Sequence, residues 1–170
     1  MARTTLFKGD PLELEGPELK VGDKAPDVAL KKDLATSINL SETNGKPRIL
    51  SVVPSLDTPV CAEQTKRFNQ EAANLSGVDI YTISVDLPTA QARFCGAEGI
   101  DPERVKVYSD HADTAFGKAF GTLIPGLRIH SRALFVLDAA GTIQHVEYVP
   151  ELTDHPNYDA ALACAKKLAG

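Results

Sequence analysis

The sequence predicts an α/β fold in which helices flank a central mixed β-sheet. Short β-branched strand candidates alternate with segments of helical periodicity, and the last two strand candidates follow each other directly, as in a hairpin. Turn signals rich in glycine and proline separate these elements. At 170 residues the chain is long enough to bury one sizeable core and short for two. We therefore expect a single domain over residues 1–170.

The first part of the chain contains only short strand candidates before one strong one. Thr4–Leu14 (TTLFKGDPLEL) has two short runs around Gly-Asp-Pro, which predicts an N-terminal β-hairpin over about residues 3–15. Gly22–Leu30 and Ala35–Leu40 are short or punctuated by proline, so they suit edge or loop segments. After the turn signal NGKP, the β-branched run Arg48–Pro54 (RILSVVP) predicts a buried strand.

The remainder of the chain alternates between helical and strand patterns. Phe68, Ala72 and Leu75 are spaced by four and three residues, which makes one apolar stripe on a helix. Pro88 in a first turn and Gly121 after a last turn mark two shorter helices. In order, we expect a helix from Pro59 to about Asn74, a strand over Val78–Val85, a helix over Leu87–Glu98, a strand over Val105–Tyr108, a helix over Thr114–Phe120, a hairpin of Ala133–Leu137 with Ile143–Val149, and a closing helix over Asn157–Leu168.

The composition excludes several classes of function. Hydrophobic residues make up 43% and charged residues 24% of the chain, which is ordinary for a globular protein. The net charge is −5, and the lysines and arginines are scattered among the acids, so nucleic acid is not an expected partner. No apolar run approaches the roughly 20 residues that span a bilayer, and the first residues do not resemble a secretory signal. We expect a cytoplasmic protein with no membrane partner. Three widely spaced cysteines do not indicate a disulfide framework.

The stretch PSLDTPVC, residues 54–61, places a cysteine at the start of the first predicted helix. If Thr58 is the N-cap, Pro59, Val60 and Cys61 take the first three helical positions, and the Thr58 side chain is expected to accept an amide hydrogen bond. A capping box carries Glu at the third position, where a negative charge faces the free amides of the first turn. A thiolate at that position would be stabilised in the same way by the amides and the helix dipole, which lowers a cysteine pKa. A small buried hydrophobe is the alternative, and the local pattern leaves both readings open.

Several stretches of the sequence resemble the bacterial thiol peroxidase subfamily of the peroxiredoxins. PSLDTPVCAEQTKRFN (54–69) fits the pattern Pro, three residues, Thr, two residues, Cys. DLPTAQARFCGAEGI (86–100) resembles the segment with the resolving cysteine, and SRALFVLD (131–138) resembles the arginine-bearing strand. The closing VEYVPELTDHPNYDAAL is also similar, so the resemblance covers nearly the whole chain. It implies a thioredoxin-like (peroxiredoxin) fold.

The resemblance also implies a reaction and a set of site residues. The substrate would be hydrogen peroxide or an alkyl hydroperoxide, and Cys61 would be the peroxidatic nucleophile. Arg132, on an expected strand over Ser131–Leu137, matches the family's catalytic arginine, whose fixed charge would hold the thiolate and orient the peroxide. Thr58 would cap the helix and offer its hydroxyl to the sulfur or the peroxide. Three residues would shape the substrate pocket: Pro54, Pro59 and Val60. No cofactor is implied.

Cys95 matches the resolving cysteine of the same subfamily. A sulfenic acid on Cys61 would condense with it to an intramolecular disulfide, which thioredoxin would reduce. A disulfide requires Cα atoms within roughly 7 Å, and the two cysteines are predicted on separate helices. We therefore expect local unwinding around one or both cysteines on oxidation. A homodimer is a further implication of the resemblance.

The other cysteine and the histidines are expected to have structural roles. Cys164, in the closing helix, has neither a cap nor a family motif, so core packing is predicted. His130 would share a strand face with Arg132. His130 and Ser131 stand where small or aliphatic residues are more usual in the subfamily, and Thr89 where an aromatic is common, which leaves the substrate preference open. The remaining histidines show no metal-ligand spacing with the cysteines, so no metal is expected: His111, His145 and His155.

Three other functions compete with peroxide reduction. A thioredoxin-like disulfide exchanger would normally show Cys-x-x-Cys, but the residues after Cys61 are Ala-Glu-Gln. A non-enzymatic thiol redox sensor or relay protein would share the first chemical step with a peroxidase, so turnover distinguishes the two. A scaffold with inert cysteines predicts that Cys61→Ser leaves peroxide reactivity unchanged.

Overall fold

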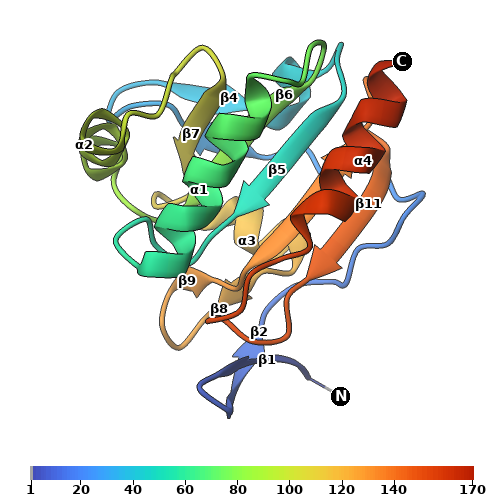
Figure 1. Ribbon diagram of the computed structural model, residues 1–170. Coiled ribbons are helices and arrows are strands. Elements are labelled where there is room, and N and C mark those ends of the chain that lie inside the picture. The colour runs from blue at the N-terminus through green and yellow to red at the C-terminus, as the bar shows by residue number, and fades with distance from the viewer. Residues whose placement is uncertain (1) are drawn as a thin grey trace.

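A seven-stranded mixed sheet forms the centre of the protein, whose computed structural model describes residues 2–170 (Figure 1). Its strand order is β11-β10-β5-β6-β7-β3-β4. Strands β5 (Arg48–Val52), β6 (Asp79–Ser84) and β7 (Val105–Ser109) are parallel and lie at the centre. On one side β10 (Ala133–Leu137) and β11 (Ile143–Tyr148) continue the sheet antiparallel, which confirms the predicted hairpin.

Short strands occupy the margins of the structure. β3 (Ala29–Lys31) and β4 (Ser37–Asn39) form the other edge of the sheet, as expected for two weak strand patterns. β1 (Arg3–Phe7) and β2 (Asp10–Leu14) make the predicted N-terminal hairpin. Three elements have no counterpart among the predictions, and each is only two to four residues long: the 3₁₀ turn η1 (Leu40–Thr43) and the pair β8 (Leu123–Ile124) and β9 (Ile129–His130).

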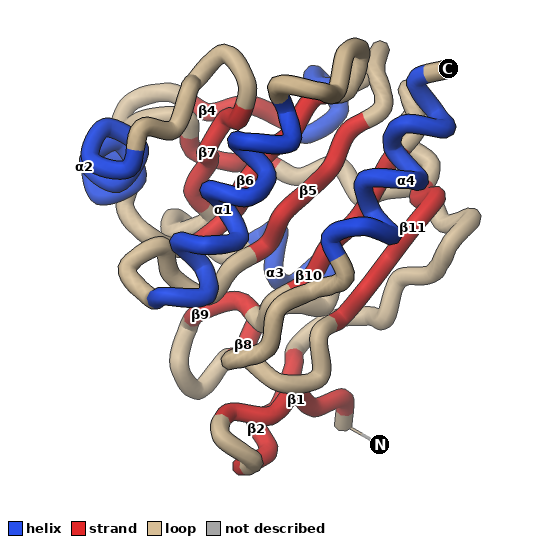
Figure 2. Tube along the Cα trace, in the orientation of Figure 1, coloured by secondary structure: helices blue, strands red, loops and turns tan. Residues whose placement is uncertain are grey.

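The helices cover both faces of the sheet. α1 (Pro59–Ala72) and α4 (Tyr158–Ala169) cross one face, and α3 (Ala115–Phe120) lies behind the other (Figure 2). α2 (Pro88–Glu98) lies at one side of the sheet. Because successive residues of a strand point to opposite faces, β5 contributes to two cores. Ile49 packs with residues of α1 and α4, whereas Leu50 packs with the aromatic residues of α3. None of the helices in the described part of the chain is long and apolar enough to cross a membrane.

The connection from β5 to α1 differs slightly from the prediction. The sequence indicates a strand to Pro54, but β5 ends at Val52. The Val53 amide still donates to the Ile83 carbonyl at 3.0 Å, and Pro54 has no amide hydrogen with which to extend the ladder. The chain then turns at the carboxyl end of β5 and enters α1. Open α/β sheets bind ligands at this edge, where the carboxyl ends of their parallel strands lie.

Candidate active site

Cys61 lies in the first turn of α1, as the sequence predicts. Thr58 has the extended backbone of an N-cap (φ −106°, ψ 147°), and Pro59 is the first helical residue. The Cys61 side chain is fully buried within the core between α1, α4 and the sheet. A reagent can therefore reach its sulfur only if this first turn opens or the neighbouring side chains move.

Thr58 does not cap the helix with its side chain, so that part of the prediction is wrong. Its hydroxyl donates to the Ser55 carbonyl at 2.8 Å, and it accepts no amide of the first helical turn. The Thr58 amide also donates to the Ser55 carbonyl, at 3.2 Å. These two bonds close a turn before the helix, and the hydroxyl that makes one of them faces backward along the chain. Thr58 thus fixes the approach of the chain to the helix.

Arg132 is buried and has three hydrogen bonds within the protein. Its Nε and Nη2 donate to the Leu152 carbonyl at 3.1 and 2.7 Å, and its Nη1 donates to Gln64 Oε1 at 3.0 Å. The residue directly precedes β10, although the sequence predicts a strand from Ser131. The strand begins later because the Ser131 amide turns away to the Thr122 carbonyl, at 2.6 Å.

Gln64 connects Arg132 to the sheet, and the sequence prediction did not include it. The side chain is fully buried, and its Nε2 donates to Ser51 Oγ on β5 at 2.7 Å while its Oε1 accepts from Arg132. Gln64 follows Cys61 by three residues, so the two lie on one face of α1. A polar residue on the buried face of an amphipathic helix is the signal that would have identified it.

A cavity of about 210 Å³ opens beside the start of α1. The predicted pocket residues Pro54, Pro59 and Val60 all line it, together with Thr58 and Arg132. The other lining residues were not predicted and are mostly apolar: Phe7, Ile129, Leu152 and Thr153. The walls are therefore largely hydrophobic, with Arg132 as the one charged residue among the described lining residues.

The N-terminal hairpin holds one wall of this cavity. The Leu6 amide donates to the Pro150 carbonyl, and the Leu152 amide donates to the Leu6 carbonyl, both at 2.8 Å. These bonds place Phe7 at the cavity and fix the segment whose Leu152 carbonyl binds Arg132. The N-terminal hairpin, Arg132 and the start of α1 are thus connected around one cavity.

Tyr158 of α4 packs against the hydrophobic core that contains Cys61. Burial is the main reason that its pKa is raised to about 12; the charges of Arg132 and Arg67 oppose the rise, and Glu63 and Cys61 add to it. Its ring packs edge-on against Phe68. The geometric link between Cys61 and Arg132 is Gln64, which follows Cys61 by one helical turn and accepts a hydrogen bond from Arg132.

Cys95 lies apart from this cavity. It is half-buried on α2 beside a different cavity of about 380 Å³ that Pro88, Gln91 and Tyr108 also line. Burial raises the pKa of the Cys95 thiol. Cys95 and Cys61 nevertheless pack on the same hydrophobic core, and both thiols are free.

Asp86 links the segment before α1 to the helix that carries Cys95. Its carboxylate accepts hydrogen bonds from Ser55 Oγ at 2.8 Å, the Leu56 amide at 2.9 Å and Ser84 Oγ at 2.7 Å. Ser84 Oγ in turn accepts from Gln91 Nε2 of α2 at 3.0 Å. The two cysteine-bearing regions therefore share one polar network.

The remaining predicted residues lie outside the site. Cys164 is half-buried at the margin of the core rather than deep within it. Among residues 2–170, no three His, Cys, Asp or Glu side chains gather as a metal site would require. His130 does not share a face with Arg132, because the chain leaves β9 at His130 and enters β10 only at Ala133. The His130 ring turns toward Asp110 and Thr122.

Comparison with known proteins gives one consistent result. The family described as Redoxin matches residues 20–162. The chain is 52% identical over 168 residues to a thiol peroxidase of Bacillus subtilis, covering 99% of each protein, and 45% identical to a thiol peroxidase of Streptococcus pneumoniae over 95% of this chain and 98% of the relative. Among solved structures, a peroxiredoxin-like protein from Aquifex aeolicus aligns with a TM-score of 0.90 at 42% identity, over 99% of this chain and 98% of that one.

Proposed function

The chain belongs to the redoxin family and is a thiol peroxidase of the peroxiredoxin type with a thioredoxin-like fold, and from this premise we propose which of its residues carry the reaction. Cys61 is the nucleophile, Arg132 and Thr58 bind and orient the peroxide, and Cys95 resolves the oxidised cysteine. The observation that carries the proposal is that Arg132, which is buried, and Thr58 line one cavity at the start of the helix that bears Cys61.

The first step forms a sulfur–oxygen bond and breaks the peroxide oxygen–oxygen bond. The Cys61 thiolate attacks one peroxide oxygen, and the other oxygen leaves as an alkoxide or hydroxide that takes up a proton. Negative charge moves from sulfur to the departing oxygen, so a fixed cation stabilises it throughout. Arg132 is suited to this role because arginine carries a fixed charge and this side chain is held in place by Leu152 and Gln64.

The second step converts the sulfenic acid to a disulfide. The Cys95 sulfur attacks the Cys61 sulfenic acid, and water leaves. Cys61 is fully buried in α1, and Cys95 lies on another helix, so the step requires unwinding of one or both first. Equal hydrogen exchange in reduced and oxidised protein at residues 58–64 and 90–98 would contradict this.

The proposed substrates are hydrogen peroxide and alkyl hydroperoxides, the latter suited to the apolar walls of the cavity. Thioredoxin is the proposed reductant of the disulfide by thiol–disulfide exchange. A cytoplasmic homodimer, each chain a single domain over residues 1–170, completes the proposal.

Peroxide consumption with a thioredoxin reducing system tests the residue assignments. We expect no activity for Cys61→Ser, loss of thioredoxin-supported turnover for Cys95→Ser, and near-normal activity for Cys164→Ser, which is the matched control. Full turnover by Cys95→Ser would exclude the intramolecular step. Consumption of a single equivalent of peroxide by the wild type would instead indicate a redox sensor.

A further inference from the structure

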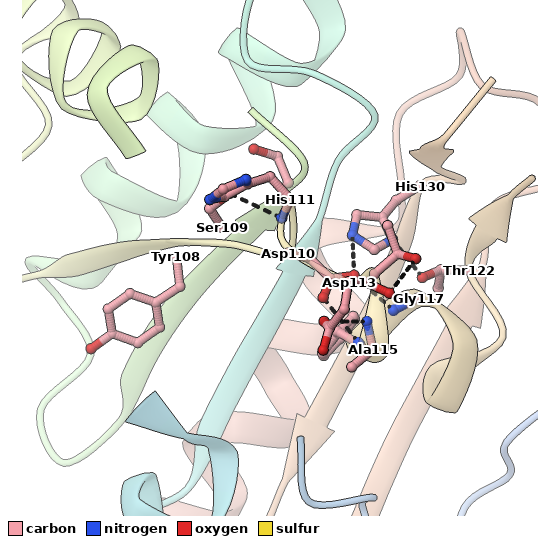
Figure 3. A network of polar contacts seen from close by, with 12 residues as sticks. Tyr108, Ser109, Asp110, His111, Asp113, Ala115, Gly117, Thr122 and His130 are labelled. Atoms are coloured by element: carbon pink, nitrogen blue, oxygen red, sulfur yellow. Dashed lines mark hydrogen bonds and ion pairs between the residues drawn. The ribbon is translucent and has the colours of Figure 1, made fainter. Parts of the chain in front are cut away.

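Three buried polar side chains, Asp110, His130 and Thr122, contact one another, and His130 precedes Arg132 by two residues (Figure 3). His130 Nδ1 is 2.9 Å from Thr122 Oγ1, and its Nε2 is 3.3 Å from Asp110 Oδ2. The second contact is an ion-pair distance without the alignment of a good hydrogen bond. Asp110 also accepts the amides of Phe116 and Gly117 at 3.0 and 2.9 Å, so the start of α3 holds its carboxylate.

The His130 ring is confined to one position. A methyl group added at Gly117 would lie 3.0 Å from His130 Cε1 and 3.0 Å from Leu123 Cβ, which is closer than side chains normally pack. The Phe116 ring meets the imidazole edge-on at 5.8 Å. An imidazole with one hydrogen bond, an adjacent carboxylate and close packing on a third side can transmit its position to the backbone that carries it.

That backbone contributes to the active-site cavity on both sides of His130. Ile129 and Arg132 line the cavity, whereas His130 between them points away into the protein. His130 pairs with Leu123 across the two-stranded β8–β9 sheet, and the Ser131 amide donates to the Thr122 carbonyl at 2.6 Å. Residues 122–124 and 129–131 therefore meet through their backbones and through the Thr122–His130 contact.

The energetics favour a role in geometry over one in stability. A buried polar contact is commonly no more stabilising than well-packed apolar groups of the same shape, because the loss of hydration of both partners offsets their attraction. An aliphatic residue at position 130 would fill the same core without that cost. The contacts of His130 with Asp110 and Thr122 instead define one arrangement of residues 129–132.

We propose that His130 is a positioning residue, which fixes Ile129 and Arg132 at the peroxide cavity through its contacts with Asp110 and Thr122. The proposal rests on the proposed function, since it concerns the arginine that orients the peroxide. A displacement of about 1 Å in such a group can cost a hundredfold in rate. Alkylation of Cys61 by iodoacetamide requires no oriented peroxide, so it should not depend on this position.

The test compares these two reactions of Cys61 in a background with Cys95→Ser and Cys164→Ser. We expect His130→Leu to lower the rate constant for peroxide about tenfold to a hundredfold, and the alkylation rate less than about threefold. His130→Gln, which retains polar groups for both partners, should recover most of the loss. Gly117→Ala should reproduce the selective loss without removing a polar group, whereas Gly96→Ala, with open space around it, is the matched control.

Folding of each variant is checked by circular dichroism. If His130→Leu does not fold, the Gly117→Ala and Gly96→Ala pair decides. Wild-type peroxide rates in the folded variants would overturn the proposal, as would an equal fall of both reactions, which would make His130 a packing residue. Failure of the background protein itself to react with peroxide would overturn the proposed function, and the positioning role with it.

Discussion

Replacement of Gln64 by leucine tests the connection between Arg132 and the sheet. The change removes the acceptor of Arg132 Nη1 and the donor to Ser51 Oγ. A buried hydrogen bond to a charged group contributes about 1.5–3 kcal/mol and a neutral one about 0.5–1.5 kcal/mol. Burial of the leucine side chain offsets part of this loss. We expect Gln64→Leu to lower the free energy of unfolding by about 2–3 kcal/mol.

The same change should reduce peroxide reactivity. Arg132 would keep its two bonds to the Leu152 carbonyl but lose the contact that holds its outer nitrogen toward α1. We expect at least about a tenfold fall in the peroxide rate constant, equivalent to about 1.4 kcal/mol of transition-state stabilisation.

Urea denaturation and stopped-flow peroxide reduction measure the two effects. Gln144→Leu is the matched control, because Gln144 also donates to a polar group, Asp138 Oδ2 at 3.0 Å, but lies on β11 and is only partly buried. It should change stability by less than about 1 kcal/mol and leave the peroxide rate unchanged. A loss below about 0.5 kcal/mol for Gln64→Leu, together with a wild-type peroxide rate, would refute the reasoning.

Three further predictions concern the network, the core and a thiol. Three groups donate hydrogen bonds to the Asp86 carboxylate, and Asp86→Asn replaces one of its two acceptor oxygens by an NH₂ donor. Hydrogen exchange at residues 55–58 should therefore become faster than in wild type. Unchanged exchange there would count against the network. Phe68→Ala empties a fully buried site and should cost about 3–5 kcal/mol in urea denaturation; a cost below about 1 kcal/mol would mean that the site collapses or that the packing is wrong. Burial raises the pKa of the Cys95 thiol, so the folded chain holds that proton more tightly than the unfolded chain. This stabilisation is present below the unfolded thiol pKa of about 8.5 and is lost as pH rises through the folded value. Between about pH 8 and about pH 10 the wild type should therefore lose more unfolding free energy than Cys95→Ala, and parallel pH profiles would contradict the shift.

The sequence predicted the long elements of the fold because each repeats its pattern over several turns or residues. The helix at Pro59–Ala72 and the hairpin of β10 and β11 are of this kind. β8 and β9 have two residues each, which is too short for any periodicity to be visible. They pair with each other across a short turn, and Leu123 also forms a bridge with Glu15, a contact distant in the sequence that a local pattern does not record.

The site was predictable to the extent that its residues lie in recognisable motifs. Thr58, Cys61 and Arg132 match named positions of motifs that resemble a known family, whereas Gln64 is a polar residue of α1 whose partners come from β5 and from the residue just before β10. The Leu152 carbonyl that binds Arg132 is a backbone group and has no signature in the sequence. The direction of the Thr58 hydroxyl depends on a rotamer, and residue type alone allows both a cap and a turn.

Mass spectrometry of the protein after one equivalent of peroxide tests the central claim most directly. The reduced chain has three free thiols. If Cys61 is oxidised and Cys95 resolves it, digestion under non-reducing conditions will give one Cys61–Cys95 linked peptide and leave Cys164 free to react with iodoacetamide. Three alkylated cysteines after peroxide treatment, or a disulfide that joins Cys164 to either partner, would contradict the account.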